Sequence, residues 1–240
     1  MITPYKDNNS GKKEQVAQMF NNIARRYDFL NHFLSLGIDK IWRRKAIKSL
    51  KGISENPVIL DVASGTGDLA IAALRLNPQK VIGVDISQEM LNYGIEKIKK
   101  RNLQDIIELK KGDSENLEFS DQSFDGITVA FGVRNFENLN KGLSEMYRVL
   151  KPGGKLVVLE FSKPRVFPVK QIYNFYFKAI LPTIGKLISK DSSAYTYLPE
   201  SVSQFPEREE FLKKLKKVGF NNCTFKALSF GISSLYVANK

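Results

Sequence analysis

Two glycines between two aspartates follow a short apolar run near residue 60. The segment Ile59–Ala70 reads ILDVASGTGDLA, so Gly65 and Gly67 have G-x-G spacing, with Asp61 before them and Asp68 after them. A glycine turn between a strand and a helix lets a ligand approach backbone amides that a side chain would block. Carboxylates beside this turn repel a pyrophosphate, whereas they attract a ligand that carries an ammonium or a sulfonium group.

Two further aspartates end later apolar runs. Asp85 closes KVIGVD, 18 residues after Gly67, where a carboxylate can accept hydrogen bonds from both hydroxyls of a ribose. Asp113 ends IIELKKGD, where it can accept a hydrogen bond from the exocyclic amine of an adenine. No G-K-[ST] sequence follows the glycine turn, which excludes a Walker-type phosphate site. The sequence therefore predicts an adenosine-containing cofactor, and its charges favour S-adenosylmethionine over NAD.

The elements that must position these residues alternate downstream of Pro57. Five apolar runs of strand length are separated by helical patterns: VILDVA, KVIGVDI, IIELKKGD, FDGITVAF and KLVVLEF. This alternation predicts a parallel sheet that is covered on both faces. The C-terminal NNCTFKALSFGISSLYVANK predicts two antiparallel strands around a short SFG turn. We therefore expect an α/β, Rossmann-like fold of the class I S-adenosylmethionine-dependent methyltransferases, with a mostly parallel seven-stranded sheet and a C-terminal antiparallel hairpin.

The domain organisation follows from the same patterns. Residues 1–240 are expected to form a single methyltransferase domain. Residues 12–55 have apolar positions at helical spacing, such as Val16, Met19 and Phe20, and predict an N-terminal helical cap. Residues 163–205 are rich in aromatic residues and prolines, and predict a helical insertion before the C-terminal helix and hairpin.

Charge and composition limit the classes of partner. The chain has 37 Lys and Arg against 25 Asp and Glu, a net charge of +12, which suits an anionic membrane surface, a nucleic acid or simply solvated lysine faces. No nucleic-acid-binding motif is present, so we expect no nucleic acid as partner. One cysteine, Cys223, and one histidine, His32, lack zinc-ligand spacing, and no metal site is expected.

The chain is expected to be cytoplasmic and not to span a membrane. Its first residues, MITPYKDNNSGKKE, are polar and lack the apolar core of a signal peptide. The longest apolar stretch, Ile172–Ser189, is interrupted by Lys178, Pro182 and Lys186.

Longer segments resemble the ubiquinone/menaquinone biosynthesis C-methyltransferases. YDFLNHFLSLGIDKIW (Tyr27–Trp42) and RVLKPGGKLVVLEFS (Arg148–Ser162) are similar to the two signatures of this family. FGVRNFEN (Phe131–Asn138) is similar to the segment that follows the family's fourth strand. The resemblance extends from about Val16 to Lys240. It implies transfer of a methyl group from S-adenosylmethionine to a ring carbon of a prenylated hydroquinone.

The resemblance also implies roles for individual residues. Cofactor contacts would come from the glycine turn, the ribose carboxylate and the residues near adenine: Asp61, Gly65, Thr66, Gly67, Asp85, Asp113 and Ser114. The catalytic and substrate-side residues would be Tyr27, Asp28, Asn31 and Arg134. Arg134 follows the fourth strand, and its permanent charge suits it to stabilise a developing phenolate. His32 falls at an unspecified position of the signature and is not assigned a catalytic role.

The predicted reaction is the C-methylation of demethylmenaquinol, as a step of menaquinone biosynthesis. A polyprenyl benzoquinol is an alternative substrate, because no residue of the sequence indicates whether the enzyme binds a naphthoquinol or a benzoquinol ring. The sequence is also compatible with a methyltransferase for RNA or another small metabolite, with a non-catalytic cofactor-binding protein and, more remotely, with a dehydrogenase. The prenyl tail predicts peripheral contact with the inner face of the cytoplasmic membrane through Phe167–Ile188. The sequence does not determine the oligomeric state, and it is compatible with a homodimer.

Overall fold

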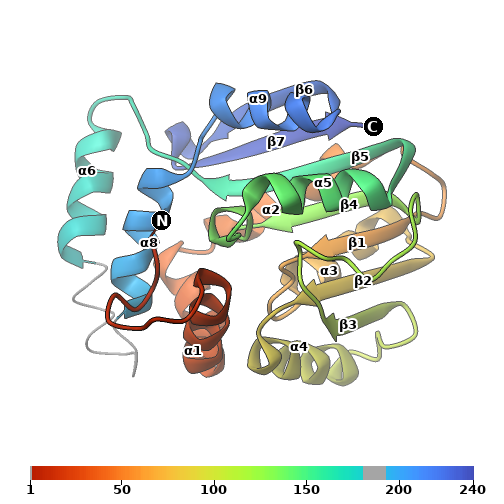
Figure 1. Cartoon of the computed structure of the whole chain (residues 1–240), viewed down its shortest axis with the longest axis horizontal. Helices are drawn as coiled ribbons and strands as arrows, with labels where there is room; N and C mark the ends of the chain where they lie inside the picture. Colours follow the sequence, from red (N-terminus) through yellow and green to blue (C-terminus); the bar gives the residue numbers. More distant parts are fainter. Residues whose placement is uncertain (1, 181–192) are drawn as a thin grey trace.

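The apolar runs of the sequence form one seven-stranded sheet in a computed structural model, which describes residues 2–180 and 193–240. The strands are β1 (Val58–Val62), β2 (Lys80–Asp85), β3 (Ile107–Lys111), β4 (Phe124–Ala130), β5 (Leu150–Phe161), β6 (Asn221–Leu228) and β7 (Ser233–Asn239). Their order in the sheet is β3-β2-β1-β4-β5-β7-β6 (Figure 1). The first five strands are parallel, and β7 is antiparallel to both β5 and β6. The predicted fold class, including the C-terminal hairpin, is therefore confirmed.

Helices cover both faces of this sheet. The helices are α1 (Lys12–Leu34), α2 (Ile38–Ser49), α3 (Asp68–Ala73), α4 (Gln88–Lys100), α5 (Leu139–Val149), α6 (Val169–Phe175), α8 (Ser193–Gln204) and α9 (Glu209–Val218). Helices α5 and α9 pack with β1, β4 and β5 in one apolar core, which includes Leu143 and Phe211. Helices α2, α3 and α4 pack on the opposite face. A sheet buried on both faces explains why its central strands read as continuous apolar runs.

The segment 12–55, expected as a helical cap, contains two helices with different positions. Helix α2 packs on the sheet, where Trp42, Ala46 and Leu50 contact β5 and β7. Helix α1 lies with α6 and α8 beyond the carboxyl ends of the parallel strands (Figure 1). These three helices share a smaller apolar core, so they enclose the edge of the sheet where open α/β folds bind ligands.

The segment 163–205, expected as a helical insertion, contains α6, a π-helical turn (Tyr176–Ile180) and α8. The predicted membrane segment Phe167–Ile188 continues into residues 181–188, which lie outside the described part of the chain. None of the helices in the described residues is both long enough and apolar enough to cross a bilayer.

Candidate active site

The glycine turn is held against the end of β2 by Asp85. One carboxylate oxygen of Asp85 accepts a hydrogen bond from the Gly65 amide at 2.8 Å, and the other accepts one from the Ser87 amide at 2.9 Å. Gly65 and Gly67 have φ values of 55° and 79°, a region that disfavours residues with a Cβ. Burial raises the pKa of Asp85, although these backbone donors oppose the shift. The carboxylate keeps lone-pair capacity that can accept a hydrogen bond from a ribose hydroxyl.

A narrow pocket of about 60 Å³ lies at this edge of the sheet, next to the turn. Four carboxylates line it beside apolar side chains, and we call it the polar pocket because of these carboxylates. The predicted residues that line it are Gly65, Asp85, Asp113, Ser114 and Tyr27. The structure therefore brings together the turn, the ribose carboxylate and the adenine-side residues that the sequence predicted. Helix α1 forms the outer wall of the pocket with Lys13, Val16 and Phe20.

The start of α1 closes the side of this pocket where Asp113 lies. Lys13 Nζ lies 2.6 Å from Asp113 Oδ2 and 3.6 Å from Glu115 Oε2. Lys12 Nζ donates hydrogen bonds to the carbonyl oxygens of Arg134 and Phe136, and burial lowers the pKa of Lys12 to about 8. Sequence analysis did not single out these lysines, because a lysine at the start of an amphipathic helix usually faces water.

Four of the predicted residues, Asp28, Asp61, Thr66 and Gly67, do not line the pocket. Asp61 is buried, accepts a hydrogen bond from Thr128 Oγ1 at 2.8 Å, and has one oxygen without a partner in the described chain. Burial raises the pKa of Asp61 to about 7. The Thr66 hydroxyl donates a hydrogen bond to Asp28 Oδ1 at 2.5 Å. Asp28 was predicted on the substrate side, yet its carboxylate is bound here and lines neither this pocket nor the cavity described below.

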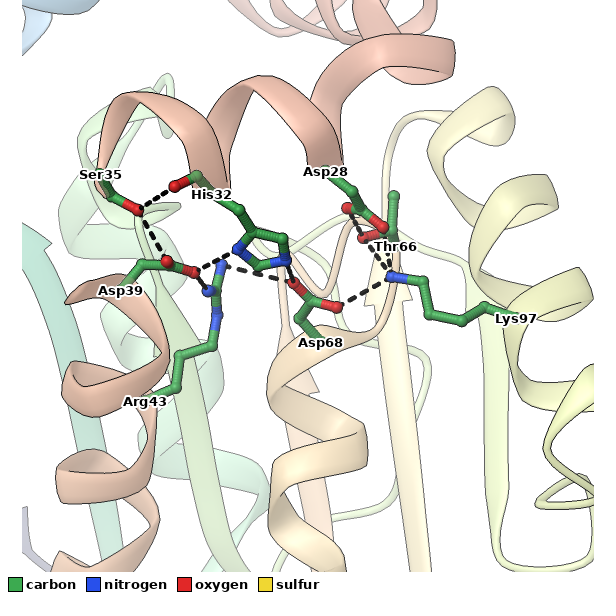
Figure 2. A network of polar contacts seen from close by, with 8 residues as sticks. All are labelled: Asp28, His32, Ser35, Asp39, Arg43, Thr66, Asp68 and Lys97. Carbon is green, nitrogen blue, oxygen red and sulfur yellow. Dashed lines mark hydrogen bonds and ion pairs between the residues drawn. The ribbon is translucent and has the colours of Figure 1, made fainter. Parts of the chain in front are cut away.

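Asp28 belongs to a network of charged side chains that joins four helices (Figure 2). Lys97 of α4 lies 2.5 Å from Asp28 Oδ2 of α1 and 2.9 Å from Asp68 Oδ1 of α3. His32 of α1 lies between two carboxylates: its Nε2 is 3.4 Å from Asp68 Oδ2, and its Nδ1 is 2.9 Å from Asp39 Oδ2 of α2. This network therefore fixes the C-terminal half of α1 to the sheet and its helices.

The His32 end of the network also has the donor types of a metal site. Ligand atoms of His32, Asp39 and Asp68 lie within 4.8 Å of one another. Arg43 forms an ion pair with Asp39 and lies 3.9 Å from Asp68, which also pairs with Lys97. Because these cations already compensate both carboxylates, the arrangement serves as an ion-pair network between helices.

A second, apolar cavity of about 390 Å³ adjoins the polar pocket. Its walls come from α1, the start of α2, the end of β5, α6 and α8. Phe20, Tyr27 and Phe131 line both the pocket and the cavity, so these three side chains form the boundary between them. Asn31 and Arg134, both predicted on the substrate side, line the cavity.

Arg134 is held by a buried carboxylate that the sequence analysis missed. Its Nη1 lies 2.7 Å from Glu160 Oε1 and donates to the Phe131 carbonyl at 2.5 Å, while its Nε donates to Ser201 Oγ at 3.3 Å. Glu160 is fully buried at the end of β5, and burial raises its pKa against the opposing charge of Arg134. Glu160 lies inside the signature RVLKPGGKLVVLEFS, and this position could have marked it as a candidate site residue in the sequence. Arg134 therefore has a structural partner as well as a place at the cavity.

Three side chains that line this cavity carry buried polar atoms without partners. The Asn31 Nδ2 atom and the hydroxyl oxygens of Tyr173 and Tyr197 are buried and have no hydrogen-bond partner among the described residues. Tyr27, at the boundary, is half-buried, and desolvation raises its pKa to about 12. The Tyr27 phenol is therefore neutral at physiological pH. It can donate a hydrogen bond but does not serve as a general base.

Comparisons with known proteins find similarity along nearly the whole chain. A family model described as the ubiE/COQ5 methyltransferase family matches residues 8–240. A Bacteroides fragilis protein named demethylmenaquinone methyltransferase is 55% identical over 241 residues, which cover 100% of this chain and 97% of that protein. A Geotalea daltonii protein named ubiquinone/menaquinone biosynthesis C-methyltransferase UbiE is 47% identical over 231 residues, covering 95% of this chain and 97% of that protein.

Solved structures share the fold at lower identity. A SAM-dependent methyltransferase from Aquifex aeolicus superposes with a TM-score of 0.58 at 22% sequence identity. The match covers 80% of this chain and 88% of that structure. At this identity the likeness concerns the arrangement of sheet and helices.

Proposed function

This chain belongs to the ubiE/COQ5 methyltransferase family, and we propose that it transfers the methyl group of S-adenosylmethionine to a ring carbon of demethylmenaquinol, giving menaquinol. We infer the substrate from the names of its relatives, among them the Bacteroides fragilis protein at 55% identity. The structural observation that carries the proposal is the shared boundary between a polar pocket and an apolar cavity. A polar cofactor and an apolar acceptor bound there would lie side by side at the carboxyl edge of the sheet.

The donors and acceptors of the polar pocket suit S-adenosylmethionine, although its volume of about 60 Å³ has to widen to hold the whole molecule. Asp85 would hold the ribose, Asp113 with Ser114 would lie at the adenine, and the backbone of Gly65 would lie against the amino-acid portion. A Cβ at Gly65 would come within 3.1 Å of Met90 Cε, so a larger residue would disturb this wall. The bound cofactor supplies an electrophilic methyl group on a sulfonium centre.

The apolar cavity fits the aromatic acceptor. Its volume of about 390 Å³ lies within the range of ordinary small-molecule sites. The ring carbon that accepts the methyl becomes more nucleophilic as the neighbouring oxygen loses its proton. Arg134 lines the cavity and would stabilise the charge that develops on this oxygen, while Glu160 fixes the direction of the guanidinium.

The cavity also opens at an apolar rim, which suits a prenyl tail. Leu36 and Ile172 line the cavity, yet they are 84% and 64% exposed. Phe167 and Phe175, 77% and 64% exposed, continue this apolar surface over α6. Exposed Lys170 lies on the same helix, and aromatic and basic residues together favour the surface of an anionic bilayer. We place the enzyme at the inner face of the cytoplasmic membrane, with the tail leaving the cavity between α1 and α6.

The reaction can be tested with the purified protein and a soluble substrate. The assay combines S-adenosylmethionine labelled in its methyl group with a reduced 1,4-naphthoquinol that carries one isoprene unit. We expect label in the methylated quinol, and cells that lack the protein should accumulate the demethylated quinone. Transfer of label to RNA or to a benzoquinol, without transfer to the naphthoquinol, would contradict the proposed substrate.

A further inference from the structure

Two tyrosine hydroxyls in the apolar cavity have no partner in the described chain. Tyr173 lies on α6 and Tyr197 on α8, and their side chains are 9% and 2% exposed. Both hydroxyl oxygens are inaccessible to solvent, and neither makes a hydrogen bond to a described residue. Each such unpaired group carries a desolvation penalty that a phenylalanine at the same position would avoid.

The surroundings of the two hydroxyls exclude an ordinary structural role. Tyr173 and Tyr197 belong to the apolar core shared by α1, α6 and α8, where the Tyr173 ring stacks on Phe177 with a centroid distance of 4.1 Å. The rings therefore account for the packing, and the hydroxyls add nothing to it. Tyr236 offers the contrast, because its equally buried ring places its hydroxyl where it accepts a hydrogen bond from the Arg208 amide at 2.7 Å.

Both tyrosines share the cavity with the residue that the proposed reaction uses. Arg134 lines the same cavity and donates a hydrogen bond to Ser201, which lies one turn after Tyr197 on α8. Burial raises the pKa of Tyr197 to about 12 and also raises the pKa of Tyr173. Both groups are therefore neutral at physiological pH, and each can donate one hydrogen bond and accept another.

We propose that the hydroxyls of Tyr173 and Tyr197 bind the ring oxygens of the quinol and thereby determine how its ring lies against the cofactor pocket. The proposal rests on the proposed function, which supplies an aromatic ring with two oxygens as the occupant. A ligand with only an apolar ring would leave both hydroxyls unpaired, and a site that hydrogen-bonds its substrate discriminates strongly against such an analogue. The two tyrosines are thus specificity-determining residues.

The test uses Tyr173→Phe, Tyr197→Phe and the double variant, with Tyr236→Phe as the matched control. Binding of 2-prenyl-1,4-naphthoquinone is followed by quenching of Trp42, which is the single tryptophan of the chain and lines the same cavity. This readout does not depend on methyl transfer. Turnover of the reduced quinol and thermal unfolding of the ligand-free protein are measured on the same samples.

We expect each of the two substitutions to raise the Kd for the naphthoquinone, and the KM for the quinol, by about fivefold. The melting temperature of the free protein should stay the same or rise, because an unpaired buried hydroxyl has been removed. The affinity for S-adenosylhomocysteine should not change. In Tyr236→Phe the opposite pattern is expected, with a lower melting temperature and an unchanged KM.

Two outcomes would overturn the inference, and a third would contradict only the proposed reaction. If the double variant binds naphthoquinone and turns over quinol as the wild type does, the two hydroxyls do not hold the ring. If their loss lowers the melting temperature as in Tyr236→Phe, their role is structural and the inference is also wrong. A wild-type protein that methylates no quinol, while its naphthoquinone affinity still falls in the variants, would contradict the proposed reaction and leave the binding role supported.

Discussion

Lys13 Nζ lies 2.6 Å from Asp113 Oδ2, inside the pocket that we assign to the cofactor. The carboxylate that was predicted to accept a hydrogen bond from adenine is therefore already paired with the first turn of α1. Both side chains are about one-third exposed, so this ion pair contributes little to stability and can be exchanged for a ligand contact.

Replacing Lys13 by methionine should tighten cofactor binding. The ligand then no longer competes with the ammonium group for Asp113, and we expect the Kd for S-adenosylhomocysteine to fall by about two- to fivefold. Isothermal titration calorimetry provides the measurement. Lys6→Met, which removes an exposed ion pair with Glu200, is the control. Weaker binding in Lys13→Met would mean that Lys13 itself contacts the cofactor.

Asp85→Ala should weaken cofactor binding by at least about tenfold, since a charged acceptor for two ribose hydroxyls is lost. The substitution also removes the acceptor of the Gly65 and Ser87 amides, so the turn should become more mobile. Calorimetry measures the affinity, and hydrogen exchange at Gly65 measures the mobility. A variant with wild-type affinity would exclude Asp85 as the ribose ligand.

Variants of Arg134 and Glu160 can separate an effect on stability from an effect on turnover. Arg134→Gln leaves the fully buried Glu160 carboxylate without its cation, which should lower the free energy of unfolding by about 3 kcal/mol. Adding Glu160→Gln removes that charge and should restore most of the stability. Turnover should stay low in both variants if Arg134 stabilises the developing phenolate. Urea unfolding and steady-state rates are the measurements, and a double variant with normal turnover would remove Arg134 from the mechanism.

Asp61 should make the stability of the protein depend on pH. Its pKa is about 7 in the folded state, against about 3.9 in an unfolded chain. Between these values the folded state keeps a proton that the unfolded state has released, so this group's contribution to stability is lost as the pH rises from about 4 to about 7. Asp61→Asn lacks this dependence and should gain stability relative to the wild type over the same interval.

Urea unfolding at a series of pH values measures that difference, and Asp105→Asn, at an exposed position, is the control. A constant difference between Asp61→Asn and the wild type from pH 4 to pH 7 would show that Asp61 is ionised throughout in the folded protein.

Charges on the outer face of α6 should weaken membrane binding. Phe167→Glu with Phe175→Glu replaces two exposed aromatic side chains outside the cavity lining, and we expect binding to phosphatidylglycerol vesicles to fall by more than about tenfold. Sedimentation with vesicles measures it. Tyr93→Glu with Ile106→Glu, at exposed apolar positions on and near α4, is the control. Equal loss of binding in both pairs would argue against a specific membrane face.

The sheet and the glycine turn could be predicted from the sequence because their signals are local. A run such as VILDVA has the length and composition of a buried strand, and the spacing of Gly65 and Gly67 fits the turn that follows it. The carboxyl ends of parallel strands then place Asp85 and Asp113 at one edge.

The cavity could not be predicted in the same way, because its polar groups depend on tertiary contacts. Tyr173 and Tyr197 read as ordinary aromatic residues until α6 and α8 are placed against α1. In the same way, Thr66 and Asp28 form a hydrogen bond with each other, and Lys97 of α4 contacts both of them. Residue types indicate which groups can react, whereas packing decides which of them face a ligand.

The common boundary of pocket and cavity has a kinetic consequence. Since Phe20, Tyr27 and Phe131 belong to both sites, donor and acceptor can be bound at once with only these side chains around the point of contact. The methyl group can then pass directly between them in a ternary complex, without a methylated enzyme as an intermediate. Initial rates measured against both substrates should give intersecting rather than parallel double-reciprocal lines.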